Sequence, residues 1–263
     1  MARDLLLEIG VEEMPSAYMG RAIADLKASA QKQLDDARLA YKEILSYGTP
    51  RRLTLWVQGL EEKQPDALVE IKGPKKSIAF DQEGNPTKAG LGFARSQKVD
   101  FNNLEVREVG GVEYIFVIKK EKGNASTAIL PGILLDIING LSFPKSMRWG
   151  YYHTRFARPI RWLLALLGSE KIDIQVENIK SNSETYGHRF LSSGALPVKD
   201  VTHYFQVLRE NYVILDQEER KALIRKQVLD VAAAAGGRPM ENGDLLEEIT
   251  YLLEYPTAFY GQF

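Results

Sequence analysis

Residues 5–15 read LLLEIGVEEMP, an apolar run that ends in a glycine, two glutamates and a proline. The apolar run predicts a short buried strand, and the stretch from glycine to proline predicts a turn. Ser16 then stands where an N-cap residue is preferred. The helix behind it is predicted by apolar residues at helical spacing, which are Met19, Ile23, Leu26, Ala30, Leu34 and Ala37.

Further strands are predicted by alternation and by turn residues. Residues 51–60 read RRLTLWVQGL after the break at residues 48–50, and we expect this strand to return beside the first. Residues 105–109 and 112–119 flank Gly110 and Gly111, which can take the positive φ angles of a tight hairpin. A second hairpin is predicted between residues 159–167 and 171–179.

The helices predicted elsewhere are interleaved with these strands. A short helix over residues 86–93 is expected behind Asn85, and another over residues 129–138, where Pro131 must lie in the first turn or bend the helix. Residues 199–209, a long segment between an Asp216 cap and Gly236, and residues 244–253 also have helical patterns. This order predicts an α+β fold with mixed, largely antiparallel sheets and packed helices. We expect two modules, 1–124 and 125–263, with a boundary near Gly123.

Composition favours a globular protein of 263 residues, with 44% hydrophobic and 26% charged residues. The net charge of −1 argues against binding nucleic acid through bulk charge, so such a contact needs a local patch. There are no cysteines, which excludes disulfides and thiolate metal sites. The first residues lack the features of a signal peptide, and no apolar run reaches the length of a membrane span. We therefore expect a cytoplasmic protein with no membrane role.

One segment combines positive charge with aromatic rings. Between residues 137 and 169 there is no aspartate or glutamate, and from Lys145 onward five basic residues are interleaved with five aromatic ones. Such a surface suits a phosphate backbone, but arginines on aromatic rings also occur in ordinary interfaces. The basic residues are Lys145, Arg148, Arg155, Arg158 and Arg161, and the aromatic residues are Trp149, Tyr151, Tyr152, Phe156 and Trp162.

The sequence shows no catalytic or metal-binding motif. His153, His188 and His203 have no partner at metal-ligand spacing, and adjacent acids do not face one another. There is no phosphate-binding loop or nucleophile elbow. His188 and Arg189 follow a predicted strand, where they could lock a turn through backbone hydrogen bonds or contact a substrate. We predict neither a catalytic residue nor a metal ligand.

Several stretches together resemble the beta subunit of bacterial heterotetrameric glycyl-tRNA synthetase. They are LLLEIGVEEMP from residue 5, TPRRL from 49, KGP from 72, AFDQEGNPTKAGLGFA from 79, FPKSMRWG from 143, FARPIRWLLALLG from 156, TYGHRF from 185 and EYPTAFYGQF from 254. They cover the whole chain in order, with mild departures at Val11 and Met14. Beta subunits of this family are longer, so the resemblance implies the N-terminal portion of such a subunit.

The resemblance implies a role in an α2β2 ligase that attaches glycine to tRNA(Gly). The catalytic core belongs to the alpha subunit of this family, so ATP and Mg are expected there, and we expect no cofactor in this chain. Its partners would be the alpha subunit, tRNA(Gly) and the remaining part of the beta subunit. From charge and aromatic spacing, the tRNA-binding residues are predicted as Lys145, Arg148, Arg155, Arg158, Arg161, His188 and Arg189.

Two other interpretations stay open at this point. The same arginines could pair with acids of the alpha subunit or of the rest of the beta subunit, in a scaffold that does not contact RNA. Hydrolytic proofreading of mischarged tRNA is a third interpretation, although the sequence shows no set of acid, base and nucleophile for it.

Overall fold

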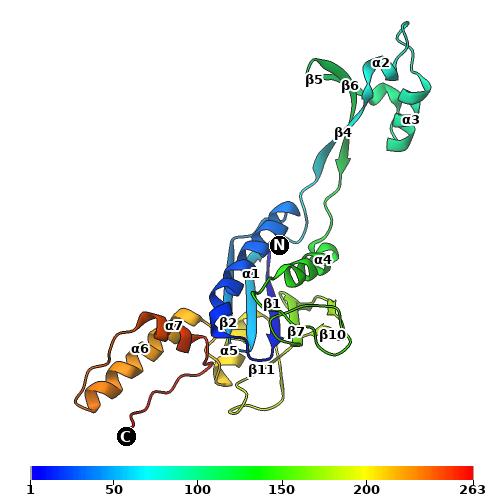
Figure 1. Ribbon diagram of the computed structural model, residues 1–263. Helices are drawn as coiled ribbons and strands as arrows, with labels where there is room; N and C mark the ends of the chain where they lie inside the picture. Colours follow the sequence, from blue (N-terminus) through cyan, green and yellow to red (C-terminus); the bar gives the residue numbers. More distant parts are fainter. Residues whose placement is uncertain (1, 263) are drawn as a thin grey trace. The chain divides into compact units, whose positions relative to one another are not determined.

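The computed structural model describes residues 2–262, which form two compact units. The main unit takes the described residues up to Lys63 and from Ala125 onward, and the inserted unit is Gln64–Asn124, coloured cyan to green in Figure 1. The boundary expected between residues 124 and 125 coincides with one end of the inserted unit. The residues before Gln64 share a unit with the second half of the chain because strands β1 (Arg3–Val11) and β7 (Ile160–Leu167) pair in one sheet.

The main sheet has the strand order β2-β3-β1-β7-β10-β9, with β8 pairing β7 off this path. Its other strands are β2 (Glu43–Thr49), β3 (Arg52–Leu60), β8 (Glu170–Lys171), β9 (Gln175–Val176) and β10 (Ile179–Asn182). All pairs are antiparallel except β10 with β7. The predicted return of residues 51–60 beside the first strand is confirmed, since Leu7 faces Leu55 across the β1–β3 ladder. The mixed sheet with packed helices confirms an α+β fold.

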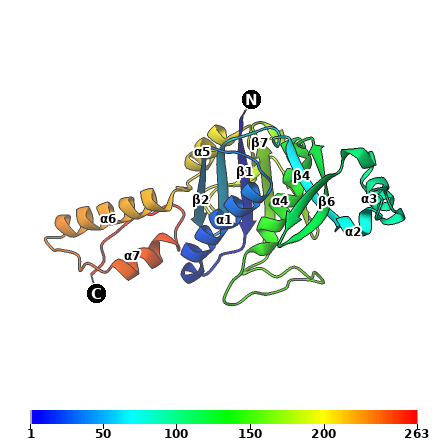
Figure 2. The same cartoon turned by 90° about the horizontal axis from the view of Figure 1, so that it is seen from above.

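One face of the main sheet is covered by α1 (Ser16–Asp36) and α4 (Ser126–Gly140), which lie across the strands in Figure 2. Leu5, Leu7 and Ile9 of β1 belong to the larger hydrophobic cluster on this side, together with Leu26 of α1 and Leu134 of α4. Their spacing by two residues directs them to one face of the strand. The alternation in LLLEI therefore decides which side of the sheet these helices cover.

The intervening residues of β1 face the other side of the sheet. Leu6 packs in a smaller cluster with Leu164 of β7 and Tyr204 of α5 (Val201–Glu210). The hairpin formed by β11 (Glu184–Tyr186) and β12 (Ala195–Pro197) lies near α5. Glu8 points to this side as well, so a carboxylate enters the second layer of the core.

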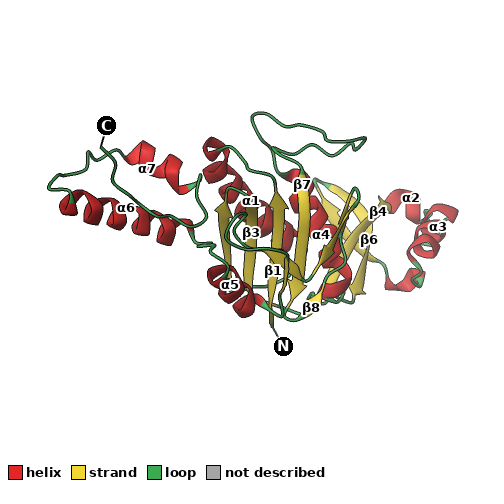
Figure 3. Ribbon diagram, turned by 90° about the horizontal axis from the view of Figure 1, so that it is seen from below, coloured by secondary structure: helices red, strands yellow, loops and turns green. Residues whose placement is uncertain are grey.

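The last two helices are α6 (Gln217–Ala234) and α7 (Gly243–Thr250), shown as neighbours in Figure 3. The predicted cap of α6 is confirmed, because the Asp216 carboxylate accepts hydrogen bonds from the amides of Glu218 and Glu219. Gly236 follows the helix with φ +75°. None of the helices in residues 2–262 combines the length and the apolar character needed to cross a membrane.

Two predicted N-caps were wrong, and a third helix begins earlier than predicted. Ser16 is the first residue of α1 and makes no side-chain cap; Pro15 holds the N-cap position. Pro131 lies inside α4 beyond its first turn, because the helix already begins at Ser126. The helix predicted behind Asn85 begins later as α3 (Lys88–Gln97), where the Thr87 hydroxyl accepts the N-cap hydrogen bond from Gly90.

The inserted unit has its own sheet, in the order β4-β6-β5. These strands are β4 (Ala67–Lys75), β5 (Glu105–Val109) and β6 (Val112–Glu121), and helix α2 (Lys76–Ala79), helix α3 and the turn η1 (Phe101–Asn103) accompany them. The predicted hairpin is confirmed: Gly110 and Gly111 join β5 to β6 with φ of +62° and +78°. The second predicted hairpin is short, since β8 pairs with β7 over two residues.

Candidate functional site

Segments that are far apart in the sequence meet at one end of the main sheet. Gly10, near the end of β1, is paired with Arg52 at the start of β3 and with Trp162 of β7. The turn after β11 is attached to the same place, because Arg51 Nη1 donates to the carbonyl oxygen of Gly187 at 3.2 Å. The sequence blocks LLLEIGVEEMP, TPRRL, FARPIRW and TYGHRF thus form one surface and the layer beneath it.

Trp162 lies at the centre of this meeting point. The guanidinium carbons of Arg51 and Arg52 are 5.6 and 5.8 Å from its ring centroid, within the range of cation–π attraction. Tyr186 packs at 4.9 Å between ring centroids. Gly10 makes room for the indole, since a Cβ at this position would lie 1.9 Å from ring atoms of Trp162.

A buried ionic core lies below the indole and consists of Glu8, Arg52 and Glu254. Arg52 Nη1 is 3.2 Å from Glu8 Oε1, and Arg52 Nη2 is 3.0 Å from Glu254 Oε1. Hydroxyl groups complete it, because Thr49 donates to Glu254 at 2.7 Å and Thr185 donates to Glu8 at 3.0 Å. Glu254 comes from the segment that follows α7, so the ionic core ties that segment to the sheet.

The ionic core contains two carboxylates for one fully buried guanidinium. Burial raises the pKa of Glu8, although Arg52 and the Thr185 hydrogen bond oppose the shift. Burial acts to lower the pKa of Arg52, but Glu254 and Glu8 outweigh it and the pKa is raised. Glu8 Oε2 and Arg52 Nε are buried without a hydrogen-bond partner among residues 2–262. A charged Arg52 therefore holds two acids that would be costly to bury alone.

Three of the predicted tRNA-binding residues are engaged by the chain itself on the surface above the ionic core. Arg161 lies 3.4 Å from Glu12, and Arg189 lies 3.1 Å from Glu13 and 3.5 Å from Glu12. Arg158 Nε donates to the backbone oxygen of Glu13 at 3.2 Å. These pairs are exposed, so water screens them and the side chains remain exchangeable.

The other predicted basic residues lie in the basic loop, which we define as residues 141–159 between α4 and β7. Lys145, Arg148 and Arg155 are exposed, and no ion pair is formed by them within the described part of the chain. Tyr151 has a relative exposure of 101%, so its whole ring faces solvent. Figure 2 shows the basic loop extending away from the sheet. This loop therefore offers cations that the chain does not neutralise and an open aromatic ring.

The basic loop is held in place by a backbone pair within it and by a carboxylate outside it. Met147 and Phe156 exchange backbone hydrogen bonds of 2.8 and 3.2 Å. The Glu177 carboxylate accepts from the amides of His153 and Thr154 and from the Thr154 hydroxyl. The Thr154 hydrogen bonds lower the pKa of Glu177, because they stabilise its ionised form.

Not every aromatic residue of this segment is available for stacking. Phe156 is buried against Phe143 with 4.7 Å between ring centroids, and Trp149 packs on the larger hydrophobic cluster. Trp162 is buried as well. Some of the aromatic residues predicted to stack on bases therefore belong to the core. Tyr151 is the ring that faces solvent fully.

His188 acts as a turn lock in the structure. Its Nδ1 accepts hydrogen bonds from the amides of Phe190 and Leu191 at 3.2 and 3.3 Å. Its own amide donates to the carbonyl oxygen of Asn211 at 2.9 Å. This is the first of the two interpretations given for the residue, and it fixes the position of Arg189 next to Glu12 and Glu13.

No group of three metal-ligating side chains is found in residues 2–262. Sequence reasoning missed the ionic core and Arg220, a fully buried arginine of α6. A usable signal was present for Glu8, because a single acid inside an apolar strand has to find a partner. Arg220 lies among polar residues of the sequence, which gave no such signal, whereas Glu254 stands between Leu253 and Tyr255 and offered the same signal as Glu8.

Comparisons with known proteins agree with the resemblance drawn from the sequence. The model of the family described as "Glycyl-tRNA synthetase beta subunit" matches residues 5–263. A glycine–tRNA ligase beta subunit from Syntrophomonas wolfei is 65% identical over the whole chain, and those from Moorella thermoacetica and Desulforamulus reducens are 50% and 49% identical. The chain spans 38% of the length of each of these relatives.

Proposed function

The chain belongs to the glycyl-tRNA synthetase beta subunit family, and from this premise we propose that it supports tRNA binding and subunit assembly in a glycine–tRNA ligase. In this proposal the enzyme attaches glycine to tRNA(Gly), and this chain contributes a binding surface and no reacting group. ATP and Mg would bind to the alpha subunit. The tRNA and the alpha subunit would be the partners of this chain, together with the rest of the beta subunit.

The observation that best supports tRNA binding is the basic loop. Lys145, Arg148 and Arg155 are exposed without an ion pair in the described residues, next to the open ring of Tyr151. Unpaired cations bind phosphates and release counterions, and an exposed ring can stack on an unpaired base. Since the net charge of the chain is −1, attraction for RNA has to come from such a local group.

The other predicted tRNA-binding residues would contribute less to RNA binding than the basic loop. Arg158, Arg161 and Arg189 can exchange the carboxylates or carbonyl of Glu12 and Glu13 for phosphates. Exposed ion pairs contribute little stability, about 0 to 1 kcal/mol each, so this exchange costs little. His188 would hold the turn that presents Arg189 instead of contacting RNA.

Charge reversal in the basic loop tests tRNA binding. We expect Arg148→Glu combined with Arg155→Glu to weaken binding of this chain to tRNA(Gly) by tenfold or more at low salt. The loss of two phosphate contacts should also flatten the slope of log affinity against log salt concentration by roughly 1.4 to 1.8. The measurement is a titration by fluorescence anisotropy at several salt concentrations, with an unrelated tRNA alongside.

The matched control makes the same change of charge on helix α1, with Arg21→Glu and Lys32→Glu, both exposed and in the same unit. It should bind tRNA like the unmodified chain. An equal loss in the control would mean that binding follows net charge, and unchanged binding of the loop variant would remove the basic loop from the RNA contact.

A protein-interaction scaffold is the second candidate function. It is favoured by the internal pairing of Arg161 and Arg189 and by the burial of Phe156 and Trp162, which leave fewer groups for RNA. In that case this chain should copurify with the alpha subunit at high salt and show no salt-sensitive tRNA binding. Binding to tRNA without any association with the alpha subunit would exclude this candidate.

A further inference from the structure

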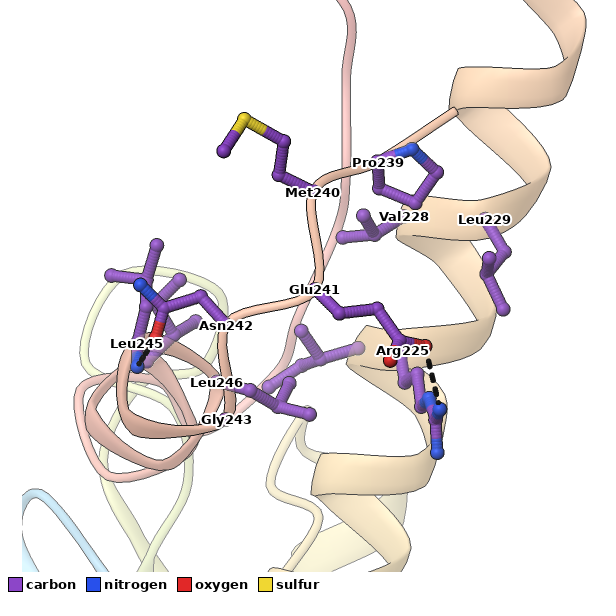
Figure 4. Close-up of a pocket in the computed structure, with 12 residues that line it drawn as sticks. Arg225, Val228, Leu229, Pro239, Met240, Glu241, Asn242, Gly243, Leu245 and Leu246 are labelled. Atoms are coloured by element: carbon purple, nitrogen blue, oxygen red, sulfur yellow. Dashed lines mark hydrogen bonds and ion pairs between the residues drawn. The ribbon is translucent and has the colours of Figure 1, made fainter. Parts of the chain in front are cut away.

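Helices α6 and α7 enclose an apolar groove, shown in Figure 4. Its walls come from Ile224, Val228 and Leu229 on α6 and from Leu245, Leu246 and Ile249 on α7. The loop that connects the helices closes one end with Pro239 and Met240. The groove lies in the main unit but outside the surface formed by the basic loop and the arginines around Trp162.

Helix α6 has few buried side chains for its length. It has 18 residues, and its buried side chains are Arg220 and Ile224, both in its first half. Most of the stability of helices in proteins comes from packing of an apolar face against the rest of the fold, and less from helix propensity. The second half of α6 therefore lacks the packing that a helix of this length normally has.

The exposed side chains along the groove are apolar. Val228, Leu229 and Leu245 are 40%, 48% and 50% exposed, and Met240 is 95% exposed. Single exposed apolar residues are common, but a contiguous group that lines a groove marks an interaction surface. These four residues lie on two helices and their connecting loop, and all four line the groove.

The charges at the rim disfavour a nucleic acid as the occupant. Arg225 lies 3.0 Å from Glu241, and Lys221 pairs with Glu247, so these cations are already compensated by neighbouring acids. An apolar floor with compensated charges suits the apolar side of an amphipathic helix.

We infer that this groove docks an amphipathic helix from the part of the beta subunit that lies outside the 38% of the relatives matched by this chain. That part belongs to the same polypeptide in the relatives, so it reaches the groove at a high effective concentration. The segment after α7 is already attached to α6, since Gln227 bonds to the carbonyl oxygen of Pro256 and the amide of Ala258. Permanent exposure of the groove would be a liability that a same-chain partner removes as soon as it folds.

Cysteine protection tests the inference because the chain contains no cysteine. Leu229→Cys gives one reactive thiol in the groove, and Lys32→Cys gives a matched thiol on the exposed side of α1. The rate of maleimide labelling is measured for the 263-residue chain alone, with the separately produced remainder of the beta subunit, and with the alpha subunit. We expect the remainder to slow labelling at position 229 by tenfold or more and to leave position 32 unchanged.

Three results would overturn the inference: unchanged labelling with the remainder present, protection by the alpha subunit alone, or protection that grows with the concentration of the chain itself. The last two would assign the groove to the alpha subunit or to a second copy. A Leu245→Glu substitution in the protected mixture should restore rapid labelling, with Lys226→Glu as its exposed control. The inference rests on family membership, and its readout involves no RNA, so failure of the proposed tRNA binding would leave it standing.

Discussion

Replacement of Arg52 by methionine should destabilise the main unit by about 3 to 5 kcal/mol, which is the usual cost of removing one member of a buried ion pair. The variant leaves Glu8 buried with a hydroxyl partner but no cation. Glu254 keeps the Thr49 hydroxyl and only the longer contact to Arg51, at 3.8 Å. For a chain of this length the melting temperature should fall by roughly 10 °C. Thermal unfolding followed by circular dichroism at pH 7 measures the effect.

The neighbouring residue provides the control for this prediction. Arg51 also lies over Trp162, but it is only partly buried and its contact with Glu254 is longer, at 3.8 Å. Arg51→Met should therefore cost about 1 kcal/mol, since it loses one partly exposed hydrogen bond and one cation–π contact. Equal melting temperatures for Arg52→Met and the unmodified chain would show that the ionic core does not stabilise the fold.

The stability that Arg52→Met loses relative to the unmodified chain, here called the deficit, should depend on pH in a defined direction. Burial already raises the pKa of Glu8 in the folded chain, and loss of Arg52 removes the main influence that lowers it. The folded state then binds more protons than the unfolded state at pH values between the ordinary carboxylate pKa and the raised one. Stability therefore rises as pH falls through that window, and the deficit should shrink between pH 7 and pH 5.

Local elements of this fold were predictable where a short pattern determines them. The β5–β6 hairpin follows from Gly110 and Gly111 and alternating neighbours, and the start of α6 follows from Asp216. The helix starts at Ser16 and Asn85 were wrong because several residues that can cap or begin a helix stand close together. Pro15 and Thr87 took those positions, and no local propensity distinguishes such neighbours strongly.

Long-range features of the fold could not be predicted in the same way. The pairing of β1 with β7 joins residues on either side of the inserted unit, and nothing local in LLLEI or IRWLLALL specifies that partner. The pairing of charged residues could not be predicted from the local sequence either. The basic segment contains no acid, yet Glu12 and Glu13 reach it from the end of β1 and pair with Arg161 and Arg189. Only the fold shows which arginines of one continuous basic segment remain unpaired.

Replacement of Arg220 by methionine should release helices α6 and α7 from the rest of the main unit. Its guanidinium donates to four carbonyl oxygens, those of Gly48, Ile214, Leu215 and Thr250, at 2.6–3.2 Å, and so joins α6 to β2, α7 and the segment between α5 and α6. Burial lowers its pKa to about 10, which leaves it charged at pH 7.

Methionine would fill much of the space of Arg220 but would leave these carbonyls without a donor, at a cost of about 3 kcal/mol or more. Limited proteolysis should then cleave within residues 217–250 while the central sheet stays resistant, because α6 itself adds little other burial. Lysine at this position keeps the charge but not the planar fork, so it should rescue little. Arg225→Met, on the exposed side of the same helix, should change stability by no more than about 0.5 kcal/mol. If Arg220→Met stayed as resistant to proteolysis as Arg225→Met, then apolar contacts, and not the buried guanidinium, would hold the helix pair in place.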